Sequence, residues 1–288
     1  MSFPAPEITI TSQLVQELVD SQFPEFSNHP ITFLSEGYDN ANYRLGDSML
    51  VRLPRRKLRV DLIRHEMEWL PKLKSKLPIP VPAPIKTGKP TSNYPWPWTI
   101  TPFFDGNSAL YEPVIESQIE KLIHFLKALH HINPSGAPGN PYRGVPLSAR
   151  DQDVKNRMNE LEKNGILVPA DIKNLWEMAV TEPIDSAPCL IHGDLHPNNI
   201  IVRNGEIQAI IDWGDITKGD PATDLVSFWM LIEDAELRSR AFDAYGASES
   251  SIKRSIGWAV FYLILFLNPD SGYTKLGAKL FSVLEKVT

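Results

Sequence analysis

The stretch CLIHGDLHPNNIIVRNGEIQAIIDWGD, residues 189–215, mixes polar side chains with isoleucine and valine at alternating positions. Its two apolar runs, 200–202 and 207–211, flank Asn204-Gly205. Asn-Gly is the dipeptide most typical of a two-residue turn between antiparallel strands. The stretch is therefore predicted to form a β-hairpin that reverses at this dipeptide.

The register of this hairpin separates two kinds of side chain, because neighbouring residues of a strand point to opposite faces. One face is wholly aliphatic and consists of Ile200, Val202, Ile207, Ala209 and Ile211. Asn199 and Asp212 point to the other face, on a diagonal of roughly 7–8 Å between backbones. Their oxygens could share one Mg²⁺, which prefers oxygen ligands and also binds water and substrate phosphates. Asp194, on the loop that enters the hairpin, is then free to act as a base.

Composition indicates a globular protein with a real core. The 288 residues suffice for one large or two modest domains. Residues 1–100 carry 12 basic and 10 acidic side chains, whereas residues 101–288 carry 17 and 25. An acidic second half disfavours nucleic acid as a partner and favours cations.

Cysteine usage and hydropathy point to the cytoplasm. The single cysteine, Cys189, excludes an internal disulfide, and the opening MSFPAPEITI lacks the features of a secretory signal. The most apolar stretch, residues 258–267, has about half of the roughly 20 residues needed to cross a bilayer. We therefore predict a buried helix there and no membrane partner.

Periodicity predicts the other elements. Strands are expected within residues 31–53, and the stretch WTITPFFDG, residues 98–106, is expected to be strand-like until glycine breaks it. The seven prolines from Pro78 to Pro97 exclude a helix there, leaving a stiff connector or a docking motif. Helices are expected at 60–73, 116–131, twice within 151–180, and at 221–237, 251–267 and 273–287.

Two motifs resemble those of protein-kinase-like enzymes. HGDLHPNN matches the H-x-D-x-x-x-x-N catalytic loop, and Asp212-Trp213-Gly214 stands in the place of the D-F-G motif. With the following GDITKGDPATDL, the chain resembles the aminoglycoside phosphotransferase family, which is related to macrolide phosphotransferases and choline kinases. The likeness covers roughly residues 31–285 and is firmest at 190–225.

The resemblance implies an α+β, protein-kinase-like bilobal fold. A small N-terminal lobe, residues 1–103, would contain an antiparallel sheet and one helix and bind the nucleotide. A larger, mainly helical C-terminal lobe, residues 104–288, would carry catalysis and bind the acceptor.

The resemblance also implies roles for the polar residues of the two motifs. Asp194 would accept or orient the proton of the attacking hydroxyl, and Asn199 and Asp212 would hold Mg²⁺. His192 would fix the catalytic loop through a backbone hydrogen bond, and Asp224 would anchor the backbone of that loop from below. The alternative for Asp194, Asn199 and Asp212 is capping of turns and of the hairpin end.

Nucleotide binding would use residues of the first lobe. Arg52 stands where the superfamily usually has a phosphate-binding lysine, and Glu66 stands where its carboxylate partner is expected; a surface arginine is the alternative. Gly37 would lie in the loop that covers the phosphates, although a plain turn explains it equally. Because Pro102 has no amide hydrogen, adenine would use the Thr101 carbonyl and the Phe103 amide.

We therefore expect an Mg²⁺-dependent kinase that moves the terminal phosphoryl of ATP or GTP to a small-molecule hydroxyl. An aminoglycoside is the favoured acceptor; a macrolide, choline or a sugar is the alternative. Candidate residues for a cationic acceptor are Asp151, Asp153, Glu160, Glu162, Glu233 and Asp234. Two other classes stay open: a metal hydrolase using His192, Asp194 and His196, and a non-catalytic nucleotide-binding scaffold.

Overall fold

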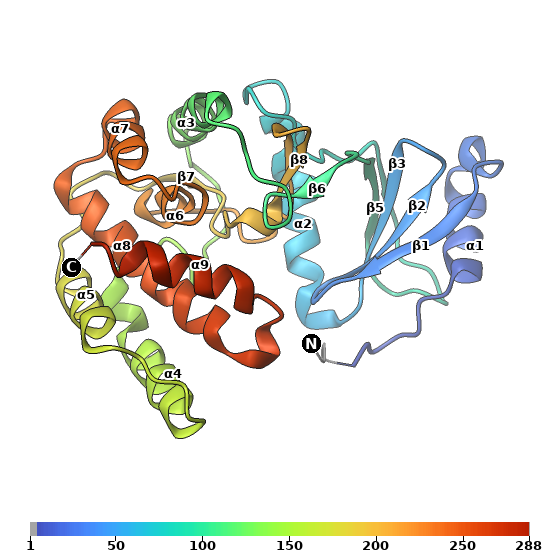
Figure 1. Cartoon of the computed structure of the whole chain (residues 1–288). Helices are drawn as coiled ribbons and strands as arrows, with labels where there is room; N and C mark the ends of the chain where they lie inside the picture. Colours follow the sequence, from blue (N-terminus) through green and yellow to red (C-terminus); the bar gives the residue numbers. More distant parts are fainter. Residues whose placement is uncertain (1–4, 288) are drawn as a thin grey trace. The chain divides into compact units, whose positions relative to one another are not determined.

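The computed structural model describes residues 5–287, so Met1–Pro4 and Thr288 of the expected lobes lie outside it. Two compact units make up the described chain (Figure 1). The N-terminal unit contains residues 5–106 together with Gln208–Gly214, and the C-terminal unit contains Asn107–Ile207 together with residues 215–287. The assignment of nucleotide binding to one unit and of catalysis to the other stays a prediction.

A five-stranded antiparallel sheet forms the centre of the N-terminal unit. Its order is β1-β2-β3-β5-β4, with β1 at Ile31–Glu36, β2 at Asn40–Leu45, β3 at Met49–Pro54, β4 at Lys86–Gly88 and β5 at Trp98–Pro102. The predicted strands within 31–53 are confirmed, and the strand-like stretch 98–106 forms β5 but ends at Pro102. The connector 78–97 has no helix, as predicted, and it buries Ile79, Val81, Tyr94 and Trp96 in the unit's core.

Two α-helices accompany this sheet, one more than the sequence analysis expected. Helix α2 occupies Val60–Leu73, the predicted range, and buries Ile63, Glu66 and Leu70 along one face. The additional helix, α1, spans Ser12–Gln22 and begins where the Thr11 side chain accepts a hydrogen bond from the amide of Leu14. Its short apolar stripe of Val15, Leu18 and Val19 is buried.

Helices dominate the C-terminal unit. They are α3 (Ser117–His130), α4 (Asp151–Lys163), α5 (Ala170–Val180), α6 (Ala222–Leu231), α7 (Ala235–Tyr245), α8 (Glu249–Leu267) and α9 (Thr274–Leu284). The prediction of one helix at 221–237 was wrong. Ile232 is extended, with φ −112° and ψ 103°, and Asp234 starts a new helix by accepting from the amide of Leu237 at 2.7 Å.

Helix α8 is the longest helix of the unit. Its 19 residues and mean hydropathy of 1.3 would allow it to cross a membrane by length and composition. However, 72% of that window is buried inside the protein, where α8 packs against α4, α5, α6 and α9. The predicted buried helix at 258–267 is therefore confirmed as the second half of α8.

The opening stretch forms the expected hairpin. Strand β8 (Ile200–Arg203) and strand β9 (Glu206–Ile210) are joined by Asn204 and Gly205, whose φ values of 54° and 78° both lie in the left-handed region. Two consecutive positive φ values are the signature of the turn type that Asn-Gly favours. Four of the five residues of the predicted aliphatic face are buried: Ile200, Val202, Ile207 and Ala209 are at most 1% exposed. The fifth, Ile211, follows the end of β9 and is only partly buried.

Candidate active site

A glycine turn carries the chain from strand β7 into the loop that resembles a catalytic loop. β7 (Cys189–Ile191) pairs antiparallel with β10 (Thr217–Gly219), and His192 follows at once. Gly193 has φ +85°, and a Cβ there would lie 2.5 Å from the carbonyl oxygen of Asp215. Only glycine fits both conditions, so this turn sets the direction in which Asp194 leaves the strand.

Asp224, on α6, holds the backbone of this turn. Its two carboxylate oxygens accept from the amides of His192 at 2.7 Å and Gly193 at 2.9 Å, and the residue is fully buried. His130 Nε2 lies 3.2 Å from Asp224 Oδ2. His192 Nδ1 accepts in turn from the amide of Asp194 at 3.2 Å. The side chains of Asp224 and His192 thus contact the backbone of the loop.

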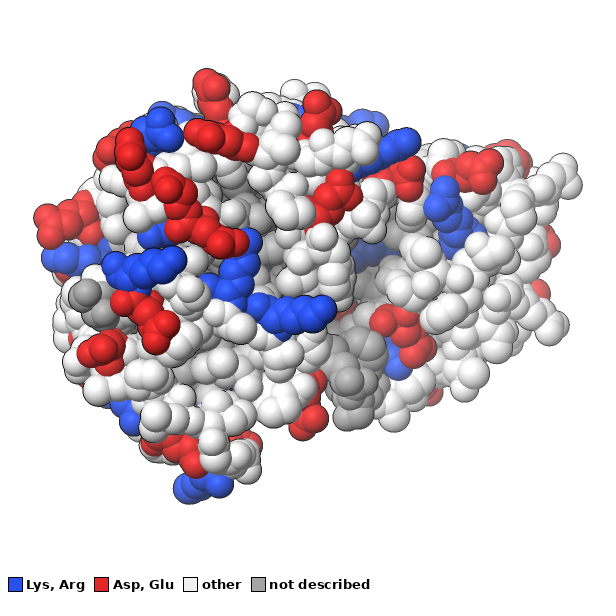
Figure 2. Space-filling view, viewed as in Figure 1, with Lys and Arg blue, Asp and Glu red and all other residues white. Residues whose placement is uncertain are grey.

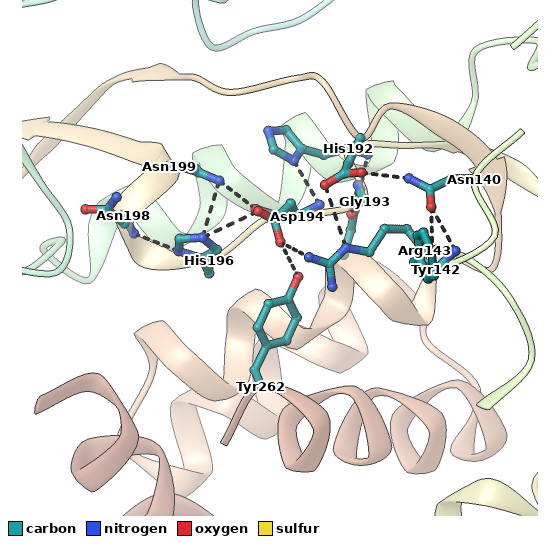
Figure 3. A network of polar contacts seen from close by, with 12 residues as sticks. Asn140, Tyr142, Arg143, His192, Gly193, Asp194, His196, Asn198, Asn199 and Tyr262 are labelled. Atoms are coloured by element: carbon teal, nitrogen blue, oxygen red, sulfur yellow. Dashed lines mark hydrogen bonds and ion pairs between the residues drawn. The ribbon is translucent and has the colours of Figure 1, made fainter. Parts of the chain in front are cut away.

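The carboxylate of Asp194 is the centre of a polar network (Figure 3). Arg143 Nη2 and the Tyr262 hydroxyl both donate to Asp194 Oδ1, each at 2.7 Å, and His196 Nε2 lies 3.6 Å from Oδ2. Burial raises the pKa of this carboxyl, but the charge of Arg143, the nearby His196 ring and the hydrogen bonds outweigh it and hold the pKa well below its usual range. Asp194 is therefore a fixed, ionised carboxylate.

Asn199 lies beside the same loop and is nearly fully buried. It ends the short 3₁₀ turn Pro197–Asn199, and its Nδ2 donates to the carbonyl oxygen of Asp194 at 2.9 Å. The side-chain oxygen is consequently the atom of Asn199 that could bind a cation. His196 caps this turn by accepting from the amide of Asn198 at 3.2 Å, and its ring packs on Tyr273.

A second polar group lies in the N-terminal unit. Arg52 donates to Glu66, and Arg52 Nη2 lies 3.9 Å from Asp212 Oδ1. Glu66 Oε1 also accepts from the amide of Trp213 at 2.9 Å, which ties α2 to the Asp-Trp-Gly segment. Burial lowers the pKa of Arg52, but Glu66 and Asp212 outweigh it and raise the pKa, so the guanidinium stays charged.

The strand-based argument for Asn199 and Asp212 was wrong, because neither residue lies in a strand. Asn199 precedes β8 in the 3₁₀ turn that Pro197 starts. Asp212 follows β9 with φ +62°, in the left-handed region. The alternation of the hairpin therefore does not orient these two side chains. The structure places Asn199 with Asp194 in the C-terminal unit, and Asp212 with Arg52 and Glu66 in the N-terminal unit.

The expected adenine contacts are corrected in part. The amide of Phe103 donates to the carbonyl oxygen of Ser48 at 2.8 Å, so it is not available to a nucleotide base. The reason is that the pairing of β3 with β5 continues one residue past Pro102, while the Phe103 ring stacks under Arg44 at 3.7 Å. Thr101 is buried at the end of β5, where it pairs with Leu50.

Gly37 lies between β1 and β2, and its amide donates to the carbonyl oxygen of Asn40 at 2.8 Å. A Cβ at Gly37 would meet only that oxygen, at 3.6 Å, which is ordinary van der Waals contact. The turn itself therefore does not require glycine.

The acidic side chains expected to meet a cationic acceptor are mostly engaged by the chain itself. Four carboxylates form ion pairs, which are Asp151 with Lys155 at 3.0 Å, Asp153 with Arg150 at 2.7 Å, Glu162 with Lys173 at 2.6 Å and Glu233 with Lys279 at 2.8 Å. Asp234 caps α7. Figure 2 shows basic side chains beside acidic ones where charged side chains gather on the viewed face.

The described part of the chain does not contain the three-residue metal site that the hydrolase alternative would need. Within residues 5–287, no group of three or more His, Cys, Asp and Glu side chains is arranged to hold a metal ion. Nδ1 of His192 and Nδ1 of His196 each accept a backbone amide instead.

Sequence reasoning missed the two donors to Asp194. Arg143 lies in the proline-rich segment between α3 and α4, where no periodic pattern points to it. Tyr262 lies in the apolar stretch of α8, which the sequence predicts to be a buried helix. The one available signal was a hydroxyl-bearing side chain within that stretch, because a buried tyrosine hydroxyl needs a hydrogen-bond partner.

Comparison with known proteins gives consistent matches. Residues 30–260 match the model of the phosphotransferase enzyme family. The chain is 25% identical over 174 residues to aminoglycoside 3'-phosphotransferase of Escherichia coli, a match that covers 54% of this chain and 61% of that protein. It is 40% identical over 129 residues to the uncharacterized protein YcbJ of Bacillus subtilis (strain 168), covering 44% and 42% of the two chains. The matches thus span about two fifths to three fifths of these relatives.

Solved structures resemble the chain over nearly its whole length. The GDP complex of aminoglycoside 2'-phosphotransferase-IIIa has a TM-score of 0.69 at 18% identity and covers 97% of this chain and 100% of that one. Macrolide 2'-phosphotransferase type I has a TM-score of 0.61 at 18% identity, covering 96% and 98%. The fold is therefore that of the kinase-like phosphotransferases. Since the family model matches most of its length, this chain belongs to the phosphotransferase enzyme family.

Proposed function

We propose that the protein is a phosphotransferase that moves the terminal phosphoryl of ATP or GTP to a hydroxyl group of a small molecule. The observation that carries this proposal is the fixed, ionised carboxylate of Asp194 on a loop that also holds Asn199. The hydroxyl oxygen forms a bond to the terminal phosphorus, and the bond from phosphorus to the bridging oxygen breaks. The proton of the hydroxyl passes to Asp194, and the nucleoside diphosphate leaves.

An aminoglycoside is the favoured acceptor. Supporting structures of similar fold include a GDP and kanamycin complex and a streptomycin–ATP ternary complex. A macrolide is the second candidate, because macrolide 2'-phosphotransferases share the fold, and a choline- or sugar-type metabolite is the third. With an aminoglycoside acceptor, the activity serves antibiotic resistance in the cytoplasm, and it needs neither nucleic acid nor a membrane.

Mg²⁺ fits the oxygen atoms that the chain offers. The side-chain oxygen of Asn199 and the half-exposed carboxylate of Asp212 would hold the ion. Bound there, Mg²⁺ would neutralise charge on the nucleotide phosphates. Asp224 and His192 support the loop that carries Asp194 and take no part in proton transfer.

Arg52 is the proposed phosphate-binding residue of the N-terminal unit. Its pairing with Glu66 fixes the guanidinium, as a lysine and glutamate pair does in protein kinases. The loop at Gly37 would cover the phosphates, and the Thr101 carbonyl would accept from adenine.

The direct test incubates the pure protein with Mg²⁺, ATP or GTP, and a panel of aminoglycosides, macrolides, choline and small sugars. Release of nucleoside diphosphate and the product mass are followed together. We expect at least one acceptor to stimulate turnover and to gain the mass of one phosphoryl group. If no acceptor does so while the nucleotide still binds, the protein is a non-catalytic scaffold. One tightly bound equivalent of zinc would instead support the hydrolase class.

Substitution of Asp212 by Asn should weaken binding of the metal–nucleotide complex by about tenfold or more, because one charged metal ligand is lost. Asparagine is the suitable replacement, since it tolerates the left-handed backbone of this position, where φ is +62°. Calorimetric titration with ATP, with and without Mg²⁺, measures the effect. Affinity for metal-free ATP should change little. An unchanged affinity for Mg·ATP would remove Asp212 from the metal site.

A further inference from the structure

The two oxygens of the Asp194 carboxylate have different surroundings. Oδ1 receives two short hydrogen bonds, from Arg143 Nη2 and from the Tyr262 hydroxyl, both at 2.7 Å. Within residues 5–287, the contact that Oδ2 makes is with His196 Nε2 at 3.6 Å, which is beyond the usual hydrogen-bonding distance. Because Oδ1 is occupied by two donors, Oδ2 is the oxygen that has room for a further partner.

Arg143 is held in place before any substrate binds. The side-chain oxygen of Asn140 accepts from the amides of Tyr142 at 2.9 Å and Arg143 at 3.1 Å, and Asn140 Nδ2 donates to Asp215 at 2.7 Å. Arg143 Nε lies 3.8 Å from Asp215 Oδ2. The guanidinium is thus fixed between two aspartates, as Figure 3 shows for its contact with Asp194.

The ring of Tyr262 completes this arrangement. The guanidinium of Arg143 lies 5.2 Å from the centre of the Tyr262 ring and 5.5 Å from that of Phe261, within the range of a cation–π contact. Burial raises the pKa of Tyr262 well above its ordinary value, so the hydroxyl keeps its proton and acts as a donor. Both donors to Asp194 therefore also contact each other and form one rigid unit.

We propose that Arg143 and Tyr262 are positioning residues, which fix Asp194 through Oδ1 so that Oδ2 receives the hydroxyl of the acceptor. The inference rests on the proposed phosphotransferase function, because the acceptor hydroxyl is part of it. Neither residue needs to touch the acceptor or the nucleotide. Because they hold the carboxylate, it cannot rotate away from the attacking hydroxyl. This fixed orientation raises the reaction rate, since the reacting groups are already aligned.

Tyr262→Phe removes one donor and leaves the ring. We expect kcat with the best acceptor of the panel to fall about tenfold to hundredfold, as for loss of a hydrogen bond to a charged group. KM for the nucleotide and the melting temperature should change little. The matched control is Tyr273→Phe, which alters a tyrosine that packs on the same His196 ring and whose hydroxyl accepts from Asn198 at 3.4 Å, and it should keep the wild-type kcat.

Arg143→Met and Arg143→Lys test the second donor. Methionine removes the donor and the charge, so kcat should fall at least as far as in Tyr262→Phe, whereas lysine keeps the charge and should restore part of the loss. Arg150→Met is the matched control, because Arg150 stacks on the same Phe261 ring at 5.2 Å but pairs with Asp153. An unchanged kcat in both Arg143→Met and Tyr262→Phe would overturn the proposal.

The Tyr262→Phe, Asp194→Asn double variant shows whether Tyr262 affects kcat through Asp194 or independently of it. If Tyr262 acts through Asp194, adding Tyr262→Phe to Asp194→Asn should cause no further loss of kcat, because residues that act as a unit are not additive. A multiplicative further loss would mean that Tyr262 acts independently of Asp194 and would overturn the proposal.

A crystal structure of the Arg143→Met, Tyr262→Phe double variant gives a readout that needs no acceptor. We expect the Asp194 side chain to rotate or to occupy two conformers. One unchanged conformer would overturn the inference, whatever the activity. If the wild type shows no turnover with any acceptor, by contrast, the proposed function is refuted. The crystal structure of the double variant then tests by itself whether Arg143 and Tyr262 hold the Asp194 side chain in place.

Discussion

Asp194→Asn should lower kcat for phosphoryl transfer by about 10²–10⁴-fold, the usual contribution of a positioned proton acceptor. The change is almost isosteric and keeps one side-chain oxygen to accept from Arg143 and Tyr262, so the loop should retain its conformation. The amide, however, cannot take the proton of the attacking hydroxyl. Steady-state measurement of nucleoside diphosphate release with the best acceptor gives kcat.

The same variant should bind nucleotide as the wild type does. The proposed phosphate contact, Arg52, lies in the other compact unit and keeps its partner Glu66. Calorimetric titration with Mg·ATP measures this affinity. Asp171→Asn is the matched control, because Asp171 is an exposed aspartate in the first turn of α5, and its kcat should equal that of the wild type. Full activity in Asp194→Asn would refute the role assigned to Asp194.

Asp220→Ala should lower the free energy of unfolding by about 3–5 kcal/mol, because it leaves a buried cation without its main partner. Arg254 donates to Asp220 through Nε at 2.7 Å and through Nη2 at 3.1 Å, and both side chains are 1% exposed. Asp220 also accepts from the amide of Ala222 at 3.2 Å at the start of α6. Thermal and urea unfolding, followed by circular dichroism, should both show the loss.

Two control variants test whether the loss of stability in Asp220→Ala comes from the buried ion pair. Glu116→Ala removes one partner of the exposed ion pair with Arg240, in which the side chains are 67% and 62% exposed, and it should leave the unfolding midpoint unchanged within error. Removing both charges of the buried pair, by Asp220→Leu with Arg254→Met, should cost less than Asp220→Ala alone. The charge that then loses its partner is Asp185, which pairs with Arg254 at 3.0 Å and is 34% exposed, so water can solvate it. If Asp220→Ala unfolds at the wild-type midpoint, the buried pair does not stabilise the fold.

Much of the fold follows from short-range patterns in the sequence. The Asn204-Gly205 turn, the range of α2 and the buried helix α8 all arise from residues within one element, where backbone preference and apolar period act together. The break between α6 and α7 was not predicted, because apolar residues continue through Ile232 and the cap at Asp234 competes with them locally. The residue types of the two motifs were sufficient to suggest a phosphotransferase.

The surroundings of the site were decided by tertiary structure. Arg143 and Tyr262 reach Asp194 from 51 and 68 residues away, and Arg254 reaches Asp220 from 34 residues away. Nor did alternation along the hairpin orient Asn199 and Asp212, because a 3₁₀ turn and a left-handed residue lie outside its ladder. The physical reason is that helix period, turn propensity and strand alternation act between near neighbours, whereas these contacts depend on how separate helices and loops pack.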